Sequence, residues 1–302
     1  MKKLILLLFL LSIVITGCGD NDELDLTQAP FLGGTIGLII NFEPMGVREA
    51  NVYTIYEDEM FPIQLVLKNQ GEQDIRAGDA KVTLRGIDIN DFTGIQTPSI
   101  TTTQLIEGRS KDFNPMGGEI IVSLGNRVRY NRPIAGSEVP LDIIVDVEYN
   151  YKTRVTVPRV CFKEDLRDLR GCDIEGPKTF FNSGGPIQVK AVRQERAGRG
   201  LIALVFEVEN VGTGRSAVPG KEFSTAYNYI SYEIQPASER ALWTCRSALE
   251  NEARLIDNKA TIRCTLNEPM PEGTLVIKEI NLDINYDYQQ RVIQSLKVRR
   301  TA

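Results

Sequence analysis

The chain has 302 residues, a length that allows about two domains at roughly 150 residues each. Hydrophobic residues make up 42% and charged residues 25%, which is the composition of a folded protein and excludes a disordered chain. The sequence has no histidine and a formal net charge of −5. These two facts exclude Ser-His-Asp catalysis, Cys-His catalysis and histidine metal sites, and they argue against binding to nucleic acid.

The first residues have the pattern of an export signal. Met1-Lys2-Lys3 precedes an uncharged run of twelve residues that ends at Ile15. Twelve helical residues span about 18 Å, which is too short for the ~30 Å hydrocarbon core of a bilayer. The run leads into Ile15-Thr16-Gly17-Cys18, which resembles the lipobox of prokaryotic lipoproteins. That resemblance implies removal of residues 1–17 and a lipid on the Cys18 sulfur, and the alternative is an ordinary secretory signal.

The segment after Cys18 is predicted to be an acidic tether, over residues 18–32. Gly19 to Pro30 contains four acids and few apolar residues, so it cannot build a core. When fully extended it reaches at most about 40 Å. The run from Asp20 to Asp25 lacks the glycine and the glutamate of an EF-hand loop, so we interpret it as a solvated spacer.

Strand patterns dominate the remaining chain. Apolar residues alternate with more polar ones from Ile63 to Lys68 and again from Ile202 to Glu209. A period of two is typical of a strand that buries one face. Glycine and proline recur between such stretches at the spacing of turns. The sequence therefore predicts an all-β body.

Three pairs of similar segments recur in the same order along the chain, with offsets of 137, 141 and 151 residues. The pairs are residues 147–155 with 284–292, 67–71 with 208–212, and 33–36 with 184–187. Similar offsets indicate a duplication with small insertions. A repeated unit of roughly 115–125 residues with many short strands is typical of an immunoglobulin-like sandwich.

In each copy an alternating strand runs into Asn-x-Gly, at Asn69 to Gly71 and at Asn210 to Gly212. Asparagine can bond its own backbone and glycine permits a positive φ, so we expect the chain to reverse at these positions. Strands of the form V-x-V-x-N-x-G are typical of tandem Ig-like repeats in prokaryotic surface proteins, including the cell-adhesion-related CARDB type. The sequence resembles these repeats over about residues 35–157 and 186–299. The resemblance implies a fold and a location, and it transfers no catalytic residue.

Together these patterns predict two tandem immunoglobulin-like β-sandwich domains after a lipoprotein signal peptide and a short tether. The expected segments are a signal peptide at 1–17, the lipid-anchored tether at 18–32, a first sandwich at 33–158, a disulfide-closed connector at 159–183 and a second sandwich at 184–302.

Four cysteines remain if Cys18 carries lipid, and an even number in an exported chain indicates disulfides. Three pairings are possible, and we prefer the local one, Cys161 with Cys172 and Cys245 with Cys264. Loops of this size imply about 3 kcal/mol of stabilisation each in the chain-entropy model. A zinc site is disfavoured because the chain has no CxxC pair and no histidine.

Two groups of residues are candidate binding sites. Asp283, Asn285 and Asp287 form an oxygen-rich row that could hold calcium, but polar residues on the outer face of a sandwich are the default, and we predict no metal. The repeated tyrosine pairs, Tyr149 with Tyr151 and Tyr286 with Tyr288, continue apolar strand faces. We expect these tyrosines near the sandwich rim with their hydroxyls in water, and the alternative is an aromatic platform for a ligand.

The sequence carries no Gly-x-Ser-x-Gly, Ser-x-x-Lys or Walker A motif, so we predict no enzyme and no cofactor. The predicted function is a lipid-anchored, exported cell-surface protein that mediates protein–protein or envelope contacts. Its expected partners are the membrane, through Cys18, and other envelope proteins. Two alternatives stay open: an extracellular lipoprotein that binds a glycan or peptide, or a non-catalytic subunit of a surface enzyme or secretion complex.

Overall fold

The computed structural model describes residues 29–95, 97–167, 170–247, 249 and 251–301. The expected signal peptide, Cys18 and the tether up to residue 28 lie outside these residues. Nearly all regular structure in the described part is β, which confirms the predicted all-β class. Its helical elements are short, namely η2 (Ile89–Asp91) and α2 (Ala237–Arg240). None of the described helices has the length and apolar character needed to cross a membrane.

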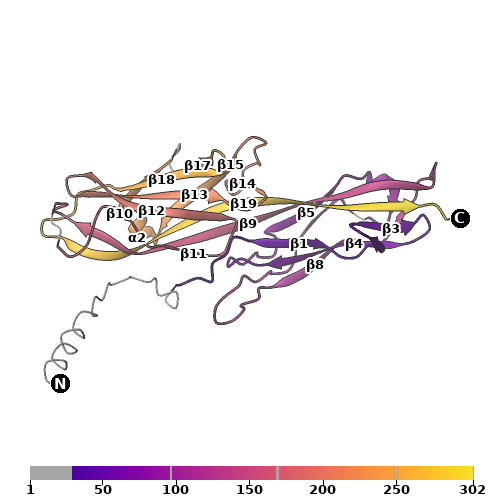
Figure 1. The fold of residues 1–302 in the computed structure, drawn as a ribbon, viewed down its shortest axis with the longest axis horizontal. Helices are drawn as coiled ribbons and strands as arrows, with labels where there is room; N and C mark the ends of the chain where they lie inside the picture. Colours follow the sequence, from indigo (N-terminus) through magenta and orange to yellow (C-terminus); the bar gives the residue numbers. More distant parts are fainter. Residues whose placement is uncertain (1–28, 96, 168–169, 248, 250, 302) are drawn as a thin grey trace, which may run out of the picture.

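Two long strands run through the whole body and are called the spine here. They are β9 (Glu138–Lys163) and β19 (Leu275–Arg299), which pair antiparallel along their lengths with one register shift between Lys278 and Ile280. At ~3.3 Å per residue, a strand of this length extends over about 85 Å. Figure 1 shows the spine along the long axis of the molecule, with β19 ending at the C-terminus.

The spine is the centre of a ten-stranded sheet with the order β17-β15-β19-β9-β5-β7, and β3 pairs parallel to the C-terminal end of β19. The flanking strands are β2 (Val47–Glu49), β3 (Val52–Tyr56), β5 (Ala80–Arg85), β7 (Ser99–Thr101), β11 (Phe181–Asn182), β14 (Arg215–Ala217), β15 (Asn228–Gln235) and β17 (Glu252–Leu255). Strands from both halves of the sequence therefore share one sheet.

Two smaller sheets accompany the two ends of the large sheet (Figure 1). The first comprises β1 (Leu38–Phe42), β4 (Phe61–Asn69), β8 (Glu119–Tyr130) and β6 (Phe92–Thr93), in that order. The second comprises β10 (Gly176–Pro177), β12 (Ile187–Gly198), β13 (Leu201–Asn210), β18 (Lys259–Leu266) and β16 (Trp243–Arg246). The result is a sandwich-like arrangement at each end of the spine.

Burial follows the strand period. In β4 buried and half-buried residues alternate without a break from Phe61 to Asn69, as expected for a strand with one face against the core. The buried side chains of both ends form one continuous apolar cluster along the spine. β9 continues through residue 158, the position at which the first sandwich is predicted to end. The division into two Ig-like domains stays a prediction.

Disulfides join Cys161 to Cys172 and Cys245 to Cys264, the pairs preferred from the sequence. Cys161 lies in β9, whereas Cys245 of β16 lies directly opposite Cys264 of β18. Trp243, two residues before Cys245, is buried, and its ring meets that of Phe162 edge to face at 6.0 Å between centroids. The two disulfides and this aromatic contact therefore all belong to the second half of the body.

Candidate functional site at the waist of the spine

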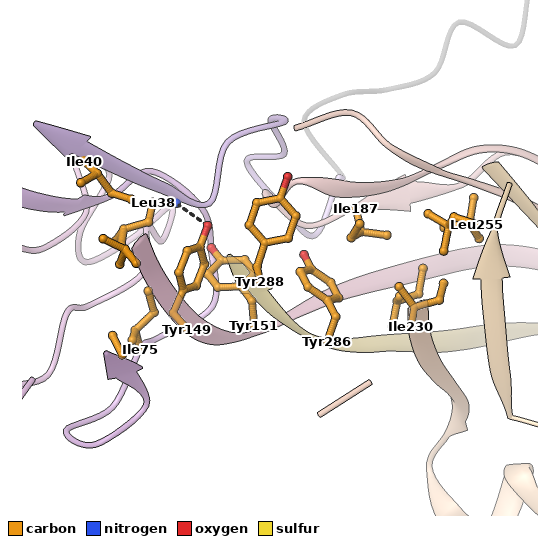
Figure 2. Close-up of a cluster of buried hydrophobic side chains, with 14 of the residues drawn as sticks. Leu38, Ile40, Ile75, Tyr149, Tyr151, Ile187, Ile230, Leu255, Tyr286 and Tyr288 are labelled. Atoms are coloured by element: carbon orange, nitrogen blue, oxygen red, sulfur yellow. Dashed lines mark hydrogen bonds between the residues drawn. The ribbon is translucent and has the colours of Figure 1, made fainter. Parts of the chain in front are cut away.

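The centre of the spine holds the four repeated tyrosines. Tyr149 lies opposite Tyr288, and Tyr151 lies opposite Tyr286. Their rings contact one another edge to face or tilted, with centroids 5.6–6.1 Å apart. Figure 2 shows them between apolar side chains of the first half, such as Leu38, and of the second half, such as Ile187. We call these four tyrosines and the loops that contact them the waist.

The expectation that the tyrosine hydroxyls face water is wrong. All four side chains are 0–2% exposed, because loops from both halves close over the waist. Each hydroxyl bonds a protein side chain instead. The partners are Gln290 for Tyr149 (2.7 Å), Asn69 for Tyr151 (3.2 Å), Thr153 for Tyr286 (2.9 Å) and Asn210 for Tyr288 (3.0 Å). The tyrosines are therefore not an open platform for a ligand.

Burial changes the acidity of these phenols. Removal from water disfavours the phenolate and raises the pKa of all four tyrosines. For Tyr288 burial raises the pKa to about 12, and hydrogen bonds with Gly214 and Asn210 oppose the rise. The four tyrosine side chains are consequently uncharged at physiological pH.

The two Asn-x-Gly segments form the same hydrogen-bonded turn. Asn69 Oδ1 accepts hydrogen bonds from the Gly71 N–H (3.1 Å) and the Tyr151 hydroxyl, and its amide donates to the Gln73 carbonyl (2.7 Å). The second copy repeats each contact. Asn210 Oδ1 accepts from the Gly212 N–H (3.2 Å) and the Tyr288 hydroxyl, and its amide donates to the Gly214 carbonyl (3.0 Å). These contacts support the duplication inferred from the sequence.

The glycines of these turns are needed for a reason other than the one expected. Gly71 and Gly212 are absent from the glycines with positive φ. A Cβ at Gly71 would collide with the Tyr151 hydroxyl, and a Cβ at Gly212 would collide with the Tyr288 hydroxyl. The close approach of the tyrosine, and not the backbone conformation, therefore requires glycine.

The third pair of similar segments, residues 33–36 with 184–187, is displaced by two residues from the pairing that the structure shows. Gln70 and Gly71 donate to the Gly37 carbonyl, and Val211 and Gly212 donate to the Pro186 carbonyl. Gly37 is thus equivalent to Pro186, and the offset of this third match is 149 instead of 151 residues. The Gly-Gly pairs that suggested the match are neighbours, because the Gly185 N–H donates to the Gly34 carbonyl at 3.2 Å.

The chain root, residues 29–33, is held at the waist by three side chains that we call the root clamp: Glu72, Arg109 and Lys111. The Glu72 carboxylate accepts from the backbone N–H groups of Leu32 (2.8 Å), Gly33 (2.8 Å) and Gly184 (2.6 Å). Arg109 donates to the Gly33 carbonyl at 2.5 Å, and Lys111 donates to the Ala29 carbonyl. Charge-assisted bonds of this kind are the stronger ones, so the root is fixed to the body. The sequence around Glu72, a single glutamate after a glycine, does not predict that this residue holds the chain root.

A cavity of about 300 Å³ adjoins the root clamp. Its charged lining comprises the basic side chains Arg109, Lys111, Lys152 and Arg154 and the acidic side chains Glu72 and Asp112. Lys152 is paired with Asp283 at 2.9 Å. The Arg109 Nε is buried and has no hydrogen-bond partner within the described part of the chain. This lining has the chemistry to accept a carboxylate or phosphate group.

The three candidate calcium ligands, Asp283, Asn285 and Asp287, are spread along β19. Asp283 pairs with Lys152, and Asp287 accepts from the Asn150 amide (2.9 Å) and the Gly220 N–H (2.7 Å). Alternate strand residues are about 6.6 Å apart, so the two carboxylates, four residues apart, are about 13 Å apart, too far to share one ion. Within the described ranges, no group of three or more Cys, Asp or Glu residues could hold a metal ion.

The sequence matches no protein-family model and no curated protein. Solved structures to which the chain is similar include the secreted serine protease VesC from Vibrio cholerae, with 11% sequence identity and a TM-score of 0.21. The match covers 93% of this chain and 54% of that one, so the chain spans about half the length of the protease. A TM-score of this size supports no conclusion about fold or activity.

Proposed function

We propose that this protein is a lipid-anchored, extracytoplasmic protein without catalytic activity, whose two Ig-like sandwich domains contact other envelope proteins. The lipobox at Ile15 to Cys18 supports the anchor. Two disulfides support an oxidising compartment, because such bonds persist mainly in exported proteins. The repeated Asn-x-Gly turn and the sandwich-like ends support the tandem Ig-like, CARDB-type interpretation.

The root clamp is the observation that carries this proposal. Glu72, Arg109 and Lys111 fix residues 29–33 to the waist. Figure 1 shows that the described chain begins between the two ends of the long axis and not at either end. A lipid on Cys18, eleven residues before Ala29, would hold the body by its middle within about 40 Å of the membrane. Both ends of the spine would then be free to contact partners.

The anchor is tested by detergent phase partition of the full-length chain expressed with its signal. We expect the protein in the detergent phase and the Cys18→Ser variant in the aqueous phase. The double variant Cys161→Ser and Cys172→Ser is the matched control, because it removes two cysteines and should still partition into detergent. A Cys18→Ser protein that stays with the membrane would contradict the lipid anchor. Chemical cross-linking on intact cells then identifies the envelope partners, and recovery of monomers alone would contradict the contact function.

The basic cavity favours one second candidate, a lipoprotein that binds an acidic glycan or peptide. Its lining places Arg109, Lys152 and Arg154 around about 300 Å³ next to the waist. We expect such a ligand to raise the melting temperature of the wild-type protein and to have a smaller effect on the Arg154→Ala variant. An equal shift in both proteins would contradict binding in this cavity.

A further inference from the structure

The Asn-x-Gly turn at Asn69 and its copy at Asn210, called the waist turns here, differ in the segment that lies beside each of them. The Asn69 N–H donates to the Gly118 carbonyl (2.9 Å), and the Asn210 N–H donates to the Asn258 carbonyl (2.8 Å). In the second copy this position belongs to a tight turn closed by Ile256 and Lys259. In the first copy it is the end of a longer loop, residues 109–118, which we call the apolar loop. The second copy forms the same turn without such a loop, so the fold does not require it.

The apolar loop presents large apolar side chains to solvent. Phe113 is 91% exposed and Met116 is 65% exposed. Single exposed apolar residues are common on proteins, but here Phe113 lies in a hydrogen-bonded turn. Ser110 Oγ accepts from the N–H groups of Phe113 (3.2 Å) and Asn114 (2.9 Å), and the Ser110 N–H donates to the Asn114 carbonyl (2.9 Å).

The base of the apolar loop is attached to the waist and to the chain root. The Arg109 N–H donates to the Gly71 carbonyl at 2.7 Å, and its side chain holds Gly33. Lys111, two residues before Phe113, donates to the carbonyl of Ala29, where the described part of the chain begins. Phe113 therefore lies beside the chain root, close to the point where the described part of the chain begins.

We propose that Phe113 and Met116 insert into the interface of the membrane that holds the lipid on Cys18. This inference rests on the lipid anchor of the proposed function. Ala29 follows Cys18 by only eleven positions, and an extended chain of that length spans at most about 40 Å. A tether this short keeps the loop at a high effective concentration near the bilayer, so a weak contact is sufficient.

The chemistry of the apolar loop fits a lipid interface. Aromatic side chains locate at the boundary between headgroups and acyl chains. Lys111, two residues before Phe113, is exposed, and basic groups near a membrane surface attract anionic headgroups. Asp112 opposes part of that attraction, so the apolar side chains supply the main contact. Lipid and loop together would hold the body at two points and fix its orientation on the membrane.

The test uses the full-length lipoprotein in vesicles of phosphatidylethanolamine and phosphatidylglycerol that carry bromine on their acyl chains. Phe113→Trp places a fluorophore in the apolar loop. Ile256→Trp is the matched control, because Ile256 is 54% exposed in the equivalent turn of the second copy. The native Trp243 is buried and gives a constant background in both variants. We expect brominated lipid to quench the Phe113→Trp protein and to leave the Ile256→Trp protein unchanged.

The outcomes distinguish failure of the lipid anchor from failure of the membrane contact by the apolar loop. Protein that fails to float with the vesicles overturns both the lipid anchor and the contact that rests on it. Protein that floats, with equal emission from both variants in brominated and plain vesicles, overturns the membrane contact alone. Equal quenching of both variants also overturns it, because the contact would then not be specific to the apolar loop.

Discussion

The two halves of the body contain the same waist turn with different additions. Asn69 with Tyr151 and Asn210 with Tyr288 make matching hydrogen bonds at matching positions. After the glycine of the turn, however, the first copy has Glu72 and the second has Thr213. The Glu72 carboxylate accepts hydrogen bonds from three backbone N–H groups, whereas the Thr213 side chain is exposed to solvent.

This comparison separates what the fold needs from what the chain adds. The second half forms its turn with Thr213 in place of a clamping carboxylate, so Asn, Gly and Tyr are sufficient for the fold. The first half adds Glu72, the basic pair of the root clamp and the apolar loop, all beside residues 29–33. The additions therefore gather around the chain root.

The largest effect expected at neutral pH is the loss of the waist asparagines. Both are buried, and Asn69 donates to the carbonyls of Gln73 and Ile106, whereas Asn210 donates to that of Gly214. Buried groups left without partners cost about 1–3 kcal/mol each. We expect Asn69→Ala to lower the free energy of unfolding by about 3 kcal/mol and Asn210→Ala by about 2 kcal/mol, measured by urea unfolding.

Asn131 is exposed, so the control variant Asn131→Ala should change the free energy of unfolding by less than about 0.5 kcal/mol. An Asn210→Ala protein as stable as the control would show that the second turn is not equivalent to the first. A larger loss for Asn210→Ala than for Asn69→Ala would reverse the comparison.

Periodicity and repetition predicted the all-β class, because one buried face leaves a period of two in strands such as β4. The repeated Asn-x-Gly and tyrosine pairs were also visible in the sequence. Their contact was not, because Tyr151 of β9 and Asn69 of β4 are 82 residues apart and meet only when the two sheets pack together. The same long-range packing buries the hydroxyls that the local pattern placed in water.

Features that depend on contacts between distant segments could not be predicted from the sequence. Gly33-Gly34 and Gly184-Gly185 looked equivalent because they are similar, but they are adjacent segments at the waist. The disulfide pairs could be preferred because both close short loops. Glu72 is one of 40 acidic residues, and only the structure shows that its carboxylate faces three N–H groups.

The second prediction concerns alkaline pH. Burial raises the pKa of Tyr288 from its ordinary 10.0 to about 12, and it raises that of Tyr151 further. The folded state therefore keeps the proton longer than the unfolded state. This stabilisation is complete below the unfolded pKa and is lost as the pH rises through the folded pKa. We expect the free energy of unfolding to fall between pH 10 and 12 by about 1.4 kcal/mol per pH unit for each such group.

Tyr288→Phe should reduce the steepness of that fall, and an ultraviolet titration should show Tyr288 ionising before Tyr151. The comparison of Tyr288→Phe with Tyr151→Phe assigns the two transitions. If all ten tyrosines ionise near their ordinary pKa in the folded protein, the waist is open to water and the buried cluster is contradicted.

The smallest effect on overall stability, and the sharpest test of the comparison, comes from Glu72. Glu72→Gln keeps the shape of the side chain but replaces one accepting oxygen with an N–H donor, which cannot accept from the N–H groups at Leu32, Gly33 or Gly184. The remaining oxygen still accepts from one side, so the NH2 group faces either Leu32 or the pair Gly33 and Gly184. Hydrogen exchange at the amides that face it should accelerate about tenfold, equivalent to about 1.4 kcal/mol of local opening. The Gly71 amide is held by Asn69 and Gly37, so its exchange should not change.

Thr213→Val is the matched variant in the second half and should leave exchange there as it was, since Thr213 is exposed. Unchanged exchange at Leu32 and Gly33 in Glu72→Gln would mean that the root is held by Arg109 and Lys111 alone, and the difference between the two halves would then lie in the basic pair.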